Sequence, residues 1–243
     1  IFPEVIIPSK SWLLVWASGK DRRNPDFPLH TNFSISADGE PLILSRPSGV
    51  VVDQVAGVQL STDLSYGRQP DGAASWFVFT NPTPGLPNTT TGYLGIAPDP
   101  VFSHTSGFYQ NAFSLNLSSP VEGASVYYTL DGSEPDEGSF LYSGPVQLTD
   151  LAGIPNDISM IPSNEEPLGA PYYEGWQAPL GEVKKACIVR AKVVAENYLP
   201  GKTITHSYLV DPQGSTRYTL PVIFLNTDRR NFFDPEIGIY IPG

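Results

Sequence analysis

Proline and glycine interrupt this chain so often that long helices have little room in it. The 243 residues include 25 prolines and 22 glycines. Proline removes a backbone hydrogen-bond donor and glycine lowers helix stability, so each weakens a helix interior. Both residues are typical of the turns that separate short strands. The sequence therefore predicts an all-β fold.

Short strand-like segments lie between these breakers. Residues 32–38 and 187–195 alternate apolar and polar side chains, which is typical of a strand with one wet face. Residues 11–17 form a nearly continuous apolar run, which is typical of a strand buried on both faces. Asp38-Gly39 is a hairpin turn signal. Further strands are expected at 41–44, 50–52, 76–79, 113–118, 126–130, 204–210 and 220–225.

Several side chains in these segments are candidates for the core. Trp12, Trp16 and Trp76 lie within strand-like runs, so we expect them to be buried. His206 lies on an alternating strand and is expected to pack in the core. Cys187, the only cysteine, has no partner for a disulfide within the chain and is expected to be a small buried hydrophobe.

The chain divides at a stretch rich in proline, glycine and threonine, residues 81–92. Such stretches are typical of linkers between folded modules. The predicted second module contains a long proline-rich insertion, and loops of that length tend to be functional or disordered. We place a first β module at 1–88, a linker at 89–96, a second β module at 97–211 with its insertion at 150–182, and the start of a further region at 212–243.

The charge is unevenly distributed along the chain. The formal net charge is −11, and no lysine or arginine occurs between Arg68 and Lys184, an interval that holds 13 acidic residues. A surface without cations does not neutralise phosphates, so this excludes nucleic acid and anionic membranes as partners of that region. No apolar run reaches the length of about 20 residues that a membrane span requires.

The sequence lacks the motifs of the common catalytic and nucleotide-binding sites. It has no glycine-rich phosphate loop, no His-Glu-x-x-His zinc motif and no Gly-x-Ser-x-Gly nucleophile motif. Its three histidines, His30, His104 and His206, share no spacing typical of metal ligands. We therefore expect no catalytic residue and no ATP binding in this chain.

Four carboxylates cluster in the acidic loop, residues 131–137: Asp131, Glu134, Asp136 and Glu137. Oxygen ligands on a flexible loop suit Ca²⁺, and closely spaced carboxylates repel one another unless a cation lies between them. The alternative is a plain hairpin turn, in which Asp131-Gly132 supplies the turn geometry. No cofactor is expected, apart from calcium at this loop.

Three aromatic residues lie in the insertion: Tyr172, Tyr173 and Trp176. Exposed rings in such loops stack on sugar faces, whereas buried rings anchor a loop on its own domain. Packing is the favoured interpretation, and sugar binding is the alternative.

The first module contains a series of short motifs: 12–21 (WLLVWASGKD), 29–33 (LHTNF), 65–68 (SYGR), 70–72 (PDG) and 82–85 (PTPG). With these motifs it resembles the lamin tail domain over residues 1–88. The strands with which that family opens, ahead of residues 2–3, are absent from this sequence. Such a module is expected to leave a sheet edge that recruits a partner strand, for example in a dimer.

The second module contains the motifs 126–135 (VYYTLDGSEP), 142–145 (YSGP), 189–192 (VRAK) and 206–208 (HSY). With these motifs it is similar to the chitobiase/β-hexosaminidase C-terminal type module, a β-sandwich associated with fibronectin type III domains. In that module the LDGSEP sequence is structural, which favours the hairpin-turn interpretation of the acidic loop. Residues 220–223 and 233–240 resemble the segment that leads into CotH-type kinase-like proteins.

Together these resemblances imply two successive immunoglobulin-like or fibronectin-III-like β-sandwich modules of a secreted or surface-anchored bacterial protein. The implied function is non-catalytic: adhesion, spacing, or positioning of a following kinase-like domain, with protein or glycan partners at the cell surface. A carbohydrate-binding accessory module is the alternative. A hydrolase of unrecognised type is a third possibility, since two suitably spaced carboxylates can cleave glycosides.

Overall fold

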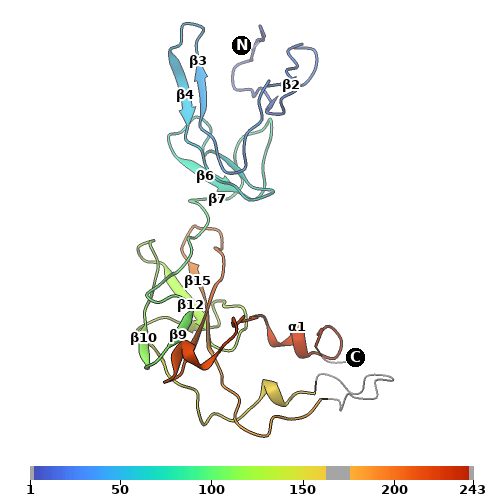
Figure 1. The fold of residues 1–243 in the computed structure, drawn as a ribbon. Coiled ribbons are helices and arrows are strands. Elements are labelled where there is room, and N and C mark those ends of the chain that lie inside the picture. Colours follow the sequence, from blue (N-terminus) through green and yellow to red (C-terminus); the bar gives the residue numbers. More distant parts are fainter. Residues whose placement is uncertain (1–2, 163–175, 241–243) are drawn as a thin grey trace, which may run out of the picture. The chain divides into compact units, whose positions relative to one another are not determined.

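The regular secondary structure of the chain consists mostly of short strands, as a computed structural model that describes residues 3–162 and 176–240 shows (Figure 1). Strands account for 28% of the residues and helical elements for 5%, which confirms the all-β prediction. The chain separates into two compact units. Unit 1 contains residues 1–96 and 197–199, and unit 2 contains residues 97–196 and 200–243.

A five-stranded sheet forms the centre of unit 2. Its order is β13-β12-β15-β16-β9, with β9 and β16 parallel and the other neighbours antiparallel. The strands are β9 (Gly107–Tyr109), β12 (Ser125–Thr129), β13 (Phe140–Leu141), β15 (Cys187–Val194) and β16 (Ile204–Val210).

Two short strand pairs provide the second layer of unit 2. The pairs are β10 (Phe113–Leu115) with β14 (Val146–Leu148), and β8 (Val101–Phe102) with β11 (Leu117–Ser118). The ring of Phe113 on β10 lies 5.6 Å from that of Tyr208 on β16, so the two layers pack face to face. This is a β-sandwich, as expected from the sequence.

The core of unit 2 follows from the alternation along β15. From Val189 to Val193 every second residue of this strand is fully buried, as the sequence pattern predicts. Cys187, at the start of β15, is half-buried, and its thiol lies 3.5 Å from the Thr149 carbonyl oxygen. The buried apolar residues of unit 2 are Ala97, Leu115, Leu117, Val126, Val146, Leu148, Val189, Ala191, Val193, Tyr208, Leu209 and Val210.

Unit 1 consists of three small sheets. β1 (Val15–Trp16) and β2 (Leu29–His30) pair in parallel. β3 (Leu42–Ser45) and β4 (Val51–Val55) form an antiparallel hairpin. The third sheet has the order β5 (Ser65–Arg68), β6 (Trp76–Phe79) and β7 (Gly92–Tyr93).

The burial predicted for Trp12 and Trp16 is wrong. Their exposed fractions are 46% and 52%. The segment 11–17 contributes only the two residues of β1, and neither Val15 nor Trp16 is buried, so no element packs fully over either face of this short strand. Trp16 instead stacks on His30, with ring centroids 6.4 Å apart. Trp76 is half-buried, between the stacked ring of Tyr66 and a guanidinium group.

The predicted strand at 32–38 is also wrong, since Ser34 makes only one isolated bridge, with Ser18. A turn does form at Asp38-Gly39, where the Gly39 N–H donates to the Ser36 carbonyl at 3.1 Å, but it joins no hairpin; the hairpin turn lies further along the chain, where the Gly49 N–H donates to the Arg46 carbonyl. Gly39 still needs to be glycine: its φ is +92°, and a Cβ atom there would lie 2.6 Å from the Val58 backbone.

The segment after β16 is not the strand that the sequence predicts at 220–225. It contains no strand in the described structure, and Pro221 supplies no N–H group for a sheet. Three short helical elements occur among the described residues: η1 (Ile158–Met160), η2 (Gly214–Arg217) and α1 (Arg229–Phe233). Within the described ranges, none of the helices has the length and hydropathy of a membrane span.

Candidate functional site

The acidic loop follows β12 and turns back at Gly132, which has a φ of +86°. Asp131 Oδ1 accepts hydrogen bonds from the hydroxyl of Ser133 at 2.6 Å and from its backbone N–H at 3.0 Å. These bonds, the hydroxyl first, lower the pKa of Asp131. The carboxylate therefore stabilises its own turn.

Glu134 reaches from the acidic loop to the central sheet. Its carboxylate accepts a hydrogen bond of 2.5 Å from Arg190 Nη2 on β15 and another from the Thr203 hydroxyl. Lys192 Nζ lies 4.0 Å away. Arg190 also donates from Nη1 to the Gly132 carbonyl oxygen at 2.8 Å. Glu134 and Arg190 thus fasten the loop to the sheet.

The remaining two acids of the loop do not join this cluster. Asp136 Oδ1 accepts from the Gly138 N–H at 2.9 Å and from the Ser139 hydroxyl at 3.2 Å, and Glu137 is exposed. Within the described part of the chain, no three histidine, cysteine, aspartate or glutamate side chains gather as metal ligands. Calcium at this loop stays a prediction, and the contacts favour the hairpin-turn interpretation.

The insertion is tied together at its two ends. Asn156 Nδ2 donates to the Gly181 carbonyl at 2.9 Å, and the Val183 N–H donates to Asn156 Oδ1 at 3.0 Å. Trp176 is half-buried. Tyr172 and Tyr173 lie outside the described residues, so the choice between anchoring and sugar binding stays open.

His206 has a structural environment in the central sheet. Its Nδ1 accepts a hydrogen bond of 3.0 Å from the Ser106 backbone N–H, and its ring packs against Phe102 and Tyr208 at centroid distances of 4.5 and 6.1 Å. The ring is half-buried, and this burial lowers the pKa of His206. The histidine is thus held in its neutral form, packed as expected although not fully enclosed.

The sequence did not reveal a charged cluster at the end of β16. Asp211 is only 1% exposed, and its carboxylate lies 3.2 Å from Lys184 Nζ and 3.6 Å from Arg217 Nη1. The Gln213 N–H donates to Asp211 Oδ1 at 2.8 Å. This hydrogen bond, followed by Lys184, lowers the pKa of Asp211. Lys184 also pairs with Asp150 at 3.3 Å. Lys184, the first cation after the long acidic interval, therefore has a structural role. Its position directly after that interval was the signal in the sequence that could have indicated this role.

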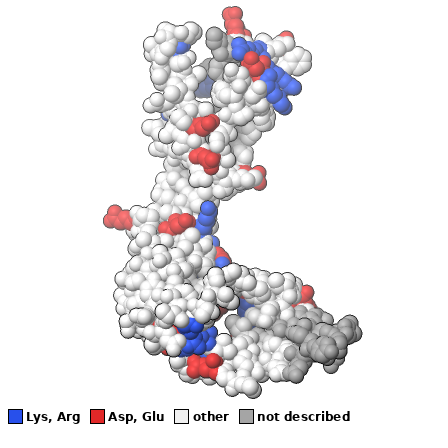
Figure 2. Space-filling view, viewed as in Figure 1, with Lys and Arg blue, Asp and Glu red and all other residues white. Residues whose placement is uncertain are grey.

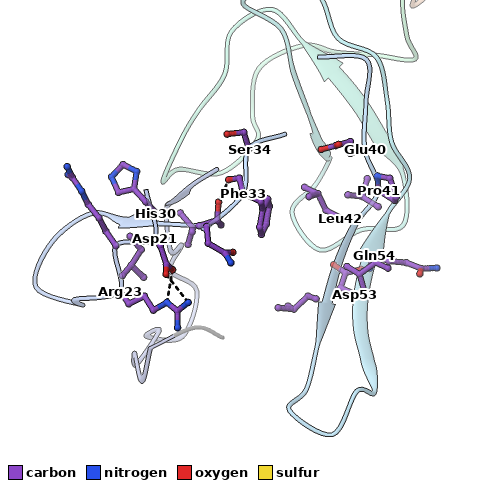
Figure 3. Close-up of a pocket in the computed structure, with 18 of the residues that line it drawn as sticks. Asp21, Arg23, His30, Phe33, Ser34, Glu40, Pro41, Leu42, Asp53 and Gln54 are labelled. Carbon is purple, nitrogen blue, oxygen red and sulfur yellow. Dashed lines mark hydrogen bonds and ion pairs between the residues drawn. The ribbon is translucent and has the colours of Figure 1, made fainter. Parts of the chain in front are cut away.

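Unit 1 contains a groove of about 770 Å³ that sequence reasoning missed (Figure 3). It lies between the segment 21–34 and the β3–β4 hairpin, and we call it the unit 1 groove. Leu42, Ile43, Leu44 and Phe33 line its apolar part. At its rim, Arg23 Nε forms an ion pair with Asp21 Oδ1 at 2.7 Å. The signal in the sequence was the apolar run at 42–44, which lines the groove and is continuous rather than alternating.

Comparison with protein families gives one match. The family model of the chitobiase/beta-hexosaminidase C-terminal domain matches residues 104–154, which contain β9 to β14 and the acidic loop. The resemblance of the second module is thereby confirmed over this part, and the matched domain is a non-catalytic accessory module. No curated protein and no solved structure matches the chain. The lamin-tail and CotH resemblances find no support in these comparisons and stay predictions.

Proposed function

We propose that the chain is a non-catalytic β-sandwich region of a secreted or surface-anchored bacterial protein, in which it spaces or positions a neighbouring domain. The observation that carries this proposal is the structural role of the acidic loop, whose Glu134 side chain holds the loop to the central sheet. Glu134 pairs with Arg190 of β15 and accepts a hydrogen bond from Thr203, which gives this carboxylate a structural role in holding the loop to the sheet. The match to an accessory domain supports the same function.

A spacer has to be stiff, and the loops of unit 2 are fixed at several points. Asn156 joins the two ends of the insertion through its hydrogen bond to the Gly181 carbonyl. The neighbouring Asp157 forms a bidentate ion pair with Arg229 of α1, with distances of 2.6 and 3.1 Å. Gly132 of the acidic loop lies against the Thr227 carbonyl oxygen. The segment after β16 is therefore attached to both the insertion and the acidic loop. The resemblance of residues 212–243 makes a kinase-like domain the proposed neighbour; adhesion to a surface protein is the related proposal.

Single-molecule energy transfer between dyes at the two ends of the chain tests the spacing function. A spacer gives one narrow distance distribution that persists in moderate salt. A broad distribution would show freely moving parts and overturn the proposal. Calorimetric titration with Mg-ATP and assays with aryl glycosides are expected to give no signal above the blank.

The second candidate function is carbohydrate binding, because Trp176 is partly exposed and the matched family is named after sugar-cleaving enzymes. A glycan array on the full chain separates the two functions. We expect no bound glycan. Binding that is lost in Trp176→Ala and kept in Phe140→Ala, an exposed aromatic elsewhere in unit 2, would replace spacing by sugar recognition.

A further inference from the structure

Two residues that are 100 positions apart in the sequence meet at the edge of the central sheet of unit 2. The backbone N–H and the hydroxyl of Ser106 lie 3.0 and 2.9 Å from His206 Nδ1. The Ser106 hydroxyl oxygen also accepts a hydrogen bond of 3.1 Å from the Ser207 N–H. A backbone N–H can only donate, so Nδ1 is the acceptor of both bonds and the proton of the neutral ring lies on Nε2. We call this arrangement the Ser106–His206 contact.

The Ser106–His206 contact lies where the edge strand β9 begins. Ser106 directly precedes Gly107, the first residue of β9. This strand has three residues and, among the described strands, pairs with β16 alone. A short strand with one neighbour has few backbone hydrogen bonds, so it belongs to the parts of a fold that open most easily. The bonds at its start are therefore important for keeping β9 on the sheet.

The surroundings of the His206 ring are apolar or neutral. The rings of Phe102 and Tyr208 pack against it. Residues 100–121 contain no aspartate, glutamate, lysine or arginine, and the surface over β9 and β10, at the lower left of Figure 2, is accordingly almost free of coloured atoms. The segment 224–226, which lines a pocket together with Ser106, contains none either.

The neighbouring strand β15 brings no charge to this face of the sheet. The residue opposite His206 is Val189. Arg190, the next residue, bonds to the hydroxyl of Thr205, whose side chain points to the other face because side chains alternate along β16. The titratable groups close to His206 in the described structure are His104 of the adjoining loop and Tyr208, and neither carries a negative charge at or below neutral pH.

We propose that the Ser106–His206 contact is an acid-sensitive fastening, and that a proton on Nδ1 releases residues 103–109 and opens the edge of the central sheet. In the protonated ring, Nδ1 carries a hydrogen atom that points at the Ser106 N–H, so a hydrogen bond becomes a contact between two donors. A positive charge beside Phe102 and Tyr208 is also costly until the ring reaches water. The proposal does not depend on the spacing function.

The direction of the pH effect follows from the burial of the ring. Burial lowers the pKa of His206 below its ordinary value of 6.5. The open form, with a hydrated ring, therefore takes up the proton at a higher pH than the closed form. The closed form keeps its full advantage above pH 6.5 and loses it as the pH falls below that value. One proton changes the opening equilibrium by at most about tenfold per pH unit.

Hydrogen exchange followed by nuclear magnetic resonance tests this on the full chain. Protection factors, which are corrected for the intrinsic pH dependence of exchange, are measured at pH 7.5 and 5.0 for the amides of Ser106 and β9. This range stays above the ordinary pKa values of aspartate and glutamate. We expect the protection factors to fall by about threefold or more at pH 5.0, with a limit of about thirtyfold for one proton. The amides between β12 and β15 are expected to keep theirs.

His206→Phe keeps a ring against Phe102 and Tyr208 but cannot take up a proton, so it is expected to abolish the pH dependence. The matched control is His104→Phe in the adjoining loop, where the imidazole Nδ1 contacts the Ser103 hydroxyl, and it is expected to keep the pH dependence. If circular dichroism shows that His206→Phe does not fold, His206→Asn replaces it, because its side-chain oxygen can accept in place of Nδ1.

Equal protection factors of the wild type at the two pH values overturn the proposal, and this comparison needs no variant. A pH dependence that survives in the folded His206 variant overturns it as well. So does a dependence that is lost in His104→Phe and kept without His206, because the titrating group would then be the other histidine.

Discussion

Replacing Tyr208 by phenylalanine removes one hydroxyl group from the core of unit 2. The Tyr208 side chain is fully buried, and its hydroxyl donates a hydrogen bond of 2.8 Å to the His104 carbonyl oxygen. The ring keeps its contacts with Phe113 and Tyr109 in the variant, so only the hydrogen bond is lost. Leaving the carbonyl without this donor is expected to lower the free energy of unfolding by about 1–2 kcal/mol at pH 7.

The same substitution has a pH dependence of predictable sign. Burial raises the pKa of the Tyr208 hydroxyl above its ordinary value of about 10. The stability that the protonated hydroxyl contributes is therefore complete below pH 10 and is lost as the pH rises above it. The loss amounts to about 1.4 kcal/mol per pH unit between the pKa values of the unfolded and the folded chain. The difference in free energy of unfolding between the wild type and Tyr208→Phe should vanish near pH 11, because the wild type has by then lost an equal amount of stability.

Urea unfolding of both proteins from pH 7 to pH 11, followed by circular dichroism, measures this difference. Tyr142→Phe is the control, because the Tyr142 side chain is half-buried and its hydroxyl bond to Asn116 is long, at 3.3 Å. Its cost at pH 7 is expected to be below about 0.5 kcal/mol. A deficit of Tyr208→Phe that stays constant up to pH 11 would refute the assignment of a buried, protonated tyrosine.

Three further substitutions have expected effects on stability. Gly132→Ala is expected to destabilise unit 2 by about 1–2 kcal/mol, because its φ is +86° and the new Cβ would lie 3.0 Å from the Thr227 carbonyl oxygen. Glu134→Ala removes the acceptor of the sheet contacts and is expected to cost about 1 kcal/mol, since its carboxylate is partly exposed. Arg68→Lys loses the planar group that lies 4.7 Å over Trp76 and is expected to cost about 0.5–1 kcal/mol, with a change in tryptophan fluorescence.

Each of these substitutions has a matched control in the same unit. The melting temperatures of all variants are measured by thermal unfolding. Gly144→Ala has open space at its new Cβ, Glu137→Ala removes an exposed acid of the same loop, and Arg46→Lys keeps the charge at an exposed turn. We expect all three controls to melt like the wild type. A control that destabilises as much as its partner variant would show that the contacts assigned to Gly132, Glu134 or Arg68 are not the cause.

The strands of unit 2 were predictable because their patterns are local. The alternation from Cys187 to Val194 reports which side chains of β15 face the core, and the observed burial follows it. Trp12 and Trp16 show the limit of such reasoning. A strand-like apolar run reports a preference for burial, but burial itself requires covering elements, which the local pattern does not contain.

The candidate site shows the same limit for polar groups. Four carboxylates that are close in sequence do not reveal whether they point toward one common site, because an aspartate can also bond to donors within its own turn. Asp131 and Asp136 each bond to a backbone N–H two residues on, and this local bond directs the carboxylate into the loop. The pairing of Asp211 with Lys184 joins residues that are remote in the chain and depends on the sheet that brings them together.

The parallel pairing of β9 with β16 determines when unit 2 can form during synthesis. β9 ends at Tyr109, whereas its partner Val210 is about one hundred residues further along. A nascent chain that has not yet released residue 210 lacks β16, and so has neither the β9–β16 pair nor the β15–β16 hairpin; its early strands stay uncovered. Chains that stop before β16 should therefore aggregate or be degraded, while those that continue past Asp211 close their sheet in one late step.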